Sequence, residues 1–121
     1  MAIFSELPVY KLGYDLLINL YNNTSGYSRE YKYTLGEKIK NEATALLINI
    51  YSANQSNKKN KPNYIELARK NIEVLRLLLR ISKDLKVLSL KSFVLLNGQV
   101  EELSKQLLAW QKYTAGAQNL E

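Results

Sequence analysis

Lysine and arginine, the side chains that neutralise phosphate groups, are concentrated in one part of this chain. Residues 58–91 contain ten basic and three acidic residues, a net charge of +7, whereas the remaining residues contain seven basic and eight acidic ones. The ten are Lys58, Lys59, Lys61, Arg69, Lys70, Arg76, Arg80, Lys83, Lys86 and Lys91. A local positive field of this kind attracts polyanions. The sequence therefore predicts a binding protein for nucleic acid or for another acidic partner.

Four of these residues share one side of a predicted helix at about 100° per residue. This basic ridge consists of Arg69, Arg76, Arg80 and Lys83. Arginine suits phosphate because its planar guanidinium group donates two parallel hydrogen bonds and keeps its charge. With the lysine loop before it (Lys58, Lys59, Lys61), the ridge forms the predicted nucleic-acid-binding site. The alternative is the solvated face of an amphipathic helix; the arginine content, the scarcity of acids and the adjoining lysines favour binding.

Catalytic chemistry has little support in this sequence. The chain has no histidine and no cysteine, which excludes His-based acid–base pairs, nucleophile triads and zinc sites of the Cys/His kind. We therefore expect a protein that is not an enzyme, with no catalytic, cofactor or metal site. The lack of cysteine favours the cytoplasm, and no apolar run approaches the ~20 residues of a membrane span. The N-terminus lacks the pattern of a secretory signal.

The residues that position the ridge belong to an all-α chain. Apolar residues recur at three- and four-residue spacing, which predicts one domain over residues 1–121, with helices at about 7–24, 34–54, 63–86 and 90–114 and a fraying tail over 115–121. Short connections favour antiparallel neighbours, so we expect an up-down antiparallel four-helix bundle. Thr34 and Glu37 fit a capping box, Asn63 is the expected start of the third helix, and Ser89 or Ser92 caps the fourth.

Apolar stripes predict which side of each helix is buried. The predicted stripes are Leu7, Tyr10, Tyr14, Leu17 and Tyr21 in the first helix, Leu35, Ile39, Ala43, Leu46, Ile50 and Ala53 in the second, and Phe93, Leu96, Val100, Leu103, Leu107 and Trp110 in the fourth. Gly13, Gly36 and Gly98 lie in or near these helices, where each glycine costs up to ~1 kcal/mol relative to alanine. We expect them to permit close approach between helices.

The third helix is apolar over more of its circumference than a monomeric bundle needs, and the fourth adds Val94 and Leu95 outside its stripe. That much exposed apolar surface is unusual for a soluble monomer. The sequence therefore predicts a homo-oligomer. In a ring-like assembly every subunit would repeat the basic ridge.

A second candidate site interleaves aromatic and basic residues at positions 27–33. Such a segment can stack unpaired bases while it neutralises phosphates. The alternative is that its tyrosines cover the end of the bundle, with their hydroxyl groups in water. We favour the structural alternative, because the nine tyrosines are spread along the chain.

Several segments resemble one known family. Leu7-Pro8-Val9-Tyr10 before a Tyr/Leu-rich helix, and Tyr33-Thr34-Leu35-Gly36-Glu37-Lys38-Ile39 before an Ala/Leu/Ile helix, are similar to the accessory variability determinant (Avd) proteins of diversity-generating retroelements. The resemblance covers roughly residues 5 to 113. It extends to a wider group of four-helix-bundle proteins encoded in rRNA intervening sequences.

The resemblance implies an accessory protein of a reverse transcriptase. Avd proteins form a pentameric barrel of four-helix bundles, bind the reverse transcriptase and nucleic acid, RNA or DNA, through a basic surface, and support mutagenic copying. Carried over by position, the basic ridge would supply that surface. The alternative is an rRNA- or ribosome-associated bundle without a reverse transcriptase partner. A membrane-surface or acidic-protein binder that uses the same ridge is a further alternative.

Overall fold

The computed structural model describes residues 7–119 and the side chains of residues 7–116. These residues form four long helices and one single-turn helix, and they contain no strand. The elements are α1 (Pro8–Thr24), α2 (Arg29–Lys32), α3 (Leu35–Gln55), α4 (Lys61–Asp84) and α5 (Leu90–Asn119). The predicted all-α class is confirmed. None of the helices within this range is both long and apolar enough to cross a membrane.

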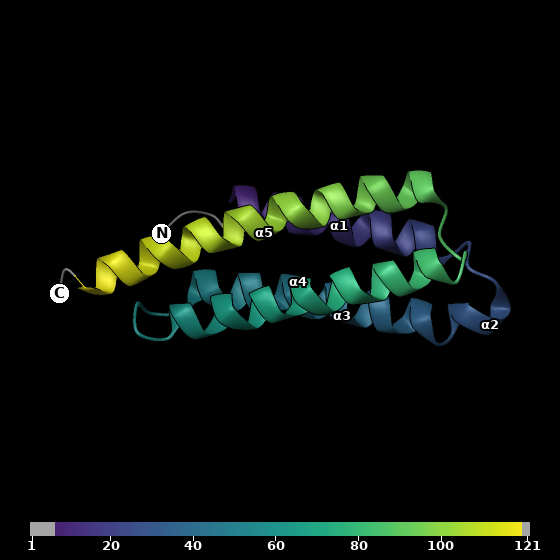
Figure 1. The fold of residues 1–121 in the computed structure, drawn as a ribbon. Helices are drawn as coiled ribbons and strands as arrows, with labels where there is room; N and C mark the ends of the chain where they lie inside the picture. Colours follow the sequence, from purple (N-terminus) through teal and green to yellow (C-terminus); the bar gives the residue numbers. More distant parts are fainter. Residues whose placement is uncertain (1–6, 120–121) are drawn as a thin grey trace.

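The four long helices lie side by side in an elongated bundle, and each runs opposite to the one before it (Figure 1). Contacts join α1 to α3, α3 to α4, α4 to α5 and α5 back to α1, so each long helix packs against two neighbours. The expected up-down four-helix bundle is therefore confirmed. Helix α2 and the connection between α4 and α5 lie at one end of the bundle, and the connection between α3 and α4 lies at the other.

The predicted stripes of the second and fourth helices form much of the core. All six stripe residues of α3 are buried, and so are the four central ones of α5, with Phe93 and Trp110 packed against them. Alternating three- and four-residue spacing keeps these aliphatic side chains on one side of a helix, where burial stabilises each by roughly 1.5–3 kcal/mol.

The predicted stripe of the first helix is confirmed only in part: Leu7, Tyr10 and Leu17 pack against the core, but Tyr14 and Tyr21 do not. Helix α1 instead buries Val9, Gly13, Leu16 and Leu20, while Tyr14 and Tyr21 are exposed. Both stripes have helical spacing, and the aliphatic one is buried because a tyrosine hydroxyl favours water. Gly13 assists this packing: a Cβ atom there would lie 3.2 Å from methyl groups of Ile50 and Leu47 on α3.

Two predicted helix starts differ from the structure. The Thr34 hydroxyl donates to the carbonyl oxygen of Glu30 (3.0 Å) instead of capping α3, and Glu37 pairs with Lys40 (3.0 Å). Helix α2 directly precedes α3, and the Thr34 hydroxyl bonds to a carbonyl group of α2 instead of to an N–H group in the first turn of α3. Helix α4 begins at Lys61 rather than Asn63, with Pro in its first turn, where no N–H partner is lost.

Helix α5 differs from its prediction at its end. The N–H group of Ser92 donates to Ser89 Oγ (3.1 Å), so Ser89 is the cap among the two candidates. The helix continues to Asn119, past the predicted end at about 114. Thr114 is buried against the bundle, which anchors the last turns, and alanine at position 115 favours helix. The predicted tail is therefore wrong over 115–119, and its last two residues lie outside the described ones.

Candidate nucleic-acid interface

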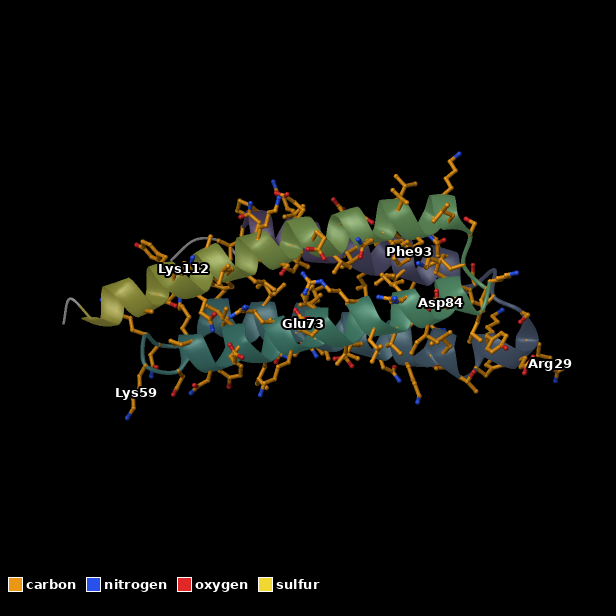
Figure 2. All side chains as sticks on the ribbon, viewed as in Figure 1. Arg29, Lys59, Glu73, Asp84, Phe93 and Lys112 are labelled. Carbon is orange, nitrogen blue, oxygen red and sulfur yellow. The ribbon has the colours of Figure 1, made fainter. Side chains whose placement is uncertain are left out.

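The basic ridge lies along the side of α4 where α4 and α5 meet. Three of its members contact α5: Arg69 bonds to Gln111, Arg76 bonds to Glu101, and the Lys83 ammonium lies 4.8 Å from the centre of the Phe93 ring. Figure 2 shows Glu73, Asp84 and Phe93 along this seam. Only Arg80 turns mainly to solvent: its side chain is 74% exposed, and it meets Asp84 at 3.8 Å.

Arg76 is the most strongly bound member of the ridge. Its Nε and a terminal nitrogen donate to the two carboxylate oxygens of Glu101, at 2.6 and 3.0 Å, and its other terminal nitrogen donates to Glu73. The hydrogen bond from Arg76 holds the pKa of Glu101 below its usual value, and the hydrogen bond to Glu101 raises the pKa of Arg76. All three guanidinium nitrogens are therefore already directed at carboxylates of the same chain.

Arg69 is held in a second small network. It donates to Gln111 Oε1 (2.5 Å), and Gln111 in turn donates through Nε2 to Glu66 Oε2 (2.8 Å). Glu66 also lies 3.7 Å from the guanidinium group of Arg69. These bonds tie the first half of α4 to the last half of α5.

The charges of the basic ridge are balanced by acidic side chains. Its four cations are matched by four acidic residues, each in an ion pair with a ridge member: Glu66, Glu73, Asp84 and Glu101. Glu101 and Gln111 were not predicted as part of this site, because both lie outside residues 58–91. Their positions in the sequence could have indicated them, because Glu101 and Gln111 directly follow Val100 and Trp110, two residues of the predicted α5 stripe.

The positive charge of the protein lies instead at the two ends of the bundle. The α2 end, residues 25–38 and 80–95, contains seven basic and three acidic residues. The loop end, residues 7–14, 55–65 and 106–119, contains five basic residues and no acidic one. At the loop end the Lys59 side chain points away from the bundle (Figure 2), and the Lys61 ammonium lies 5.9 Å from the centre of the Trp110 ring.

The tyrosines of segment 27–33 mainly cover the α2 end of the bundle. Tyr27 is buried and Tyr31 packs against the core, whereas Tyr33 is exposed, with the Lys32 ammonium 6.0 Å from its ring centre. The expectation that all hydroxyl groups reach water is wrong for Tyr27, whose hydroxyl is buried; burial raises its pKa, and the nearby Ser82 hydroxyl opposes the rise. The geometry favours the structural interpretation of this segment.

Exposed apolar side chains gather away from the seam. An outer stripe on α4 consists of Leu67, Val74, Leu77 and Leu85. Leu90, Val94 and Leu95 are exposed on α5, and a third group lies where α1 meets α3, around Tyr14, Tyr21, Ile48 and Tyr51. The predicted apolar surplus on the third and fourth helices is thus present on the surface of the single chain.

Gly98 of α5 also lies on the surface. No atom comes within 4 Å of a Cβ atom built there, so the expectation of a close helix approach is wrong for Gly98 within one chain. It is right for Gly36, where a Cβ atom would lie 3.4 Å from the carbonyl oxygen of Tyr31.

Residues 9–114 match the family model described as bAvd-like. No curated protein matches the chain. Within the described residues, no group of three or more acidic side chains is arranged to hold a metal ion. The family match covers most of the chain and agrees with the resemblance found in the sequence. The chain therefore belongs to the bAvd-like family and is an Avd-type protein.

Proposed function

We propose that this protein is a non-enzymatic, oligomeric accessory factor of a diversity-generating retroelement, which binds nucleic acid and docks the reverse transcriptase in the cytoplasm. Membership of the Avd-type family supports the accessory role. The observation that carries the nucleic-acid part is the distribution of charge: twelve basic residues against three acidic ones at the two ends of the bundle.

The structure changes which basic residues are expected to contribute most to phosphate binding. Arg80, whose side chain is 74% exposed, and the lysines of the loop remain the first candidates, whereas Lys83 is held between Asp84 and Phe93. Arg69 and Arg76 contribute less, because a phosphate would have to displace carboxylates that already bind them. The sequence contains no recognition motif for base edges, so binding should be independent of sequence and sensitive to salt.

The exposed apolar surface supports the proposed oligomer. The α4 outer stripe and the exposed leucines of α5 would be covered by neighbouring subunits. A pentamer, implied by the family resemblance, would repeat both basic ends five times.

The nucleic-acid proposal is tested by changing charge at the ends and along the seam separately. The end variant carries Lys58→Gln and Lys59→Gln; the matched seam control, which removes the same number of charges, carries Arg69→Gln and Arg76→Gln. Affinity for a labelled duplex is measured by fluorescence anisotropy at increasing salt. We expect the end variant to bind at least tenfold more weakly with a shallower salt dependence, since each lost phosphate contact reduces the slope by about one. A larger loss in the seam control would overturn the assignment.

The reverse transcriptase proposal is tested by affinity purification of tagged protein from its native host. Recovery of a reverse transcriptase supports docking. Recovery of ribosomal RNA and ribosomal proteins without a reverse transcriptase would contradict it and support the ribosome-associated alternative.

A further inference from the structure

A small pocket at the loop end combines cationic and aromatic side chains. It is lined by Lys58, Lys61, Tyr113 and Thr114, and has a volume of about 180 Å³. The last turns of α5 extend past the start of α4 (Figure 1), and the α5 residues of the lining are Tyr113 and Thr114. A volume below the ~300 Å³ of sites that enclose small organic ligands has room for one chemical group, not for a whole nucleotide.

The cationic wall of this pocket is held in position. Lys61 is the first residue of α4, and its ammonium group lies against the face of Trp110, which itself packs on the core. A cation over an aromatic face is attracted by the ring, so the lysine is oriented before any ligand arrives. The surrounding segments, residues 55–65 and 106–119, contain no acidic residue, and the next acid along the chain, Glu66, is bound to Gln111 and Arg69.

The aromatic wall is available for stacking. Tyr113 is 76% exposed, whereas Leu103 and Leu107 earlier in α5 are buried. Thr114 beside it is buried and donates its hydroxyl to the carbonyl oxygen of Gln111 (2.9 Å), which fixes this turn of α5. A tyrosine exposed on a fixed turn next to lysines is the arrangement that stacks a base and neutralises its phosphate.

Backbone groups contribute little to anion binding here. The pocket lies at the N-terminal end of α4, but the N–H group of Lys61 donates to Asn57 (3.0 Å), that of Asn63 donates to Asn60 (3.1 Å), and Pro62 has none. Recognition of an anion therefore falls to the side chains of the pocket.

We propose that the loop-end pocket receives the phosphate of an unpaired nucleotide at Lys58 and Lys61, while the base of that nucleotide stacks outside the pocket on the exposed ring of Tyr113. The proposal rests on the proposed nucleic-acid function and adds a preference for single strands. A base inside a duplex is stacked on both faces and is not available to Tyr113, whereas the lysines alone would bind either form.

The test compares a fluorescein-labelled oligo-dT strand with a duplex of the same length, using the full-length protein. We expect Tyr113→Ala to weaken binding of the single strand about tenfold, the effect of losing one base stack, and to leave duplex binding unchanged. Tyr113→Phe, which keeps the ring, should bind like the original protein. Tyr33→Ala, at the opposite end of the bundle, is the matched control.

A second readout uses Trp110, the only tryptophan of the chain. Because Lys61 lies over its ring, a phosphate that draws the ammonium group away should change the emission of Trp110 when oligo-dT is added. We expect this change to disappear in Lys61→Gln and to persist in Lys70→Gln, which removes the same charge elsewhere on α4.

The outcomes separate this inference from the proposed function. If the original protein binds neither probe at low salt, the proposed function and the inference are both wrong. If it binds both probes but Tyr113→Ala and Lys61→Gln leave single-strand binding and Trp110 emission unchanged, only the inference is overturned. Loss of single-strand preference in Tyr33→Ala instead would place the site at the α2 end and also overturn it.

Discussion

Arg76 directs its guanidinium group at two carboxylates of its own chain, although its residue type and position suit phosphate. Its side chain is 29% exposed, and Glu101 approaches it from the neighbouring helix with both oxygens. Bidentate geometry is the arrangement in which a partly exposed ion pair contributes measurably to stability. We infer that its first role is to hold α4 against α5.

A double-mutant cycle measures this role. We expect Arg76→Ala and Glu101→Ala to show a coupling free energy of about 0.5–1 kcal/mol in urea unfolding, discounted for solvent screening because Glu101 is 46% exposed. The matched control is the Arg80–Asp84 pair, whose 3.8 Å contact is more exposed and should couple near zero. Equal coupling free energies in the two cycles would show that the bidentate contact stabilises the fold no more than an exposed ion pair does.

The same contact predicts a pH dependence. Since Arg76 lowers the pKa of Glu101 in the folded chain, the ionised carboxylate stabilises the fold above the unfolded pKa, and this contribution is lost as pH falls through the folded pKa. The difference in unfolding free energy between the original protein and Glu101→Gln should therefore be full near pH 7 and shrink below about pH 4. A difference that stays constant over that range would contradict the assignment.

At the scale of helices, Gly98 lowers the stability of α5, and no close contact in the single chain requires a glycine there. A helical glycine is less favourable than alanine by roughly 0.8–1 kcal/mol, and nothing stands within 4 Å of a Cβ atom at this position. We expect Gly98→Ala to raise the free energy of unfolding by about 0.5–1 kcal/mol, measured by urea unfolding at low protein concentration.

Gly13→Ala is the control, because its new methyl group would press on Ile50 and Leu47. We expect it to gain less than Gly98→Ala or to lose stability. If Gly98→Ala were instead destabilising, a contact at this position would have to exist in solution, such as one with another subunit.

The helices also show which parts of the fold can be read from the sequence. The stripes of α3 and α5 were predictable because aliphatic residues mark one side only. Helix α1 has two stripes of similar spacing, and a period count cannot choose between tyrosines and aliphatic residues. The start of α3 was not predictable from Thr34 and Glu37, because their partners depend on the single turn of α2, which is too short to leave a periodic signal.

The candidate site was predicted only in part, because some of its contacts join two helices that are distant in sequence. The ridge and its charges could be predicted from the sequence. A count of charges along the chain could not include Glu101, because this residue belongs to α5 and meets Arg76 only in the folded chain. The lysines at the loop end could be predicted because Lys58, Lys59 and Lys61 lie close together in the sequence. Tyr113 was missed, since its role depends on α5 extending past the start of α4.

For the whole molecule, the centre of the α4 outer stripe lies away from the charged ends of the bundle. Most basic residues lie at the two ends, whereas Leu67, Val74 and Leu77 lie on the length of α4 between them. Subunits that pack side by side through such stripes would leave both ends accessible. Assembly and nucleic-acid binding should therefore be separable by mutation.

Leu77, at the centre of the α4 outer stripe, tests this separation. Its side chain is 58% exposed, so Leu77→Asp should leave the helical circular-dichroism signal unchanged while the buried charge dissociates the oligomer. Molar mass is measured by size-exclusion chromatography with light scattering, and Tyr33→Asp, at the α2 end, is the control that should stay assembled. The dissociated subunit should still bind nucleic acid, but more weakly than the oligomer, because it presents each basic end once. An original protein that runs as a monomer, or a Leu77→Asp variant of unchanged mass, would show that this stripe is not the subunit interface.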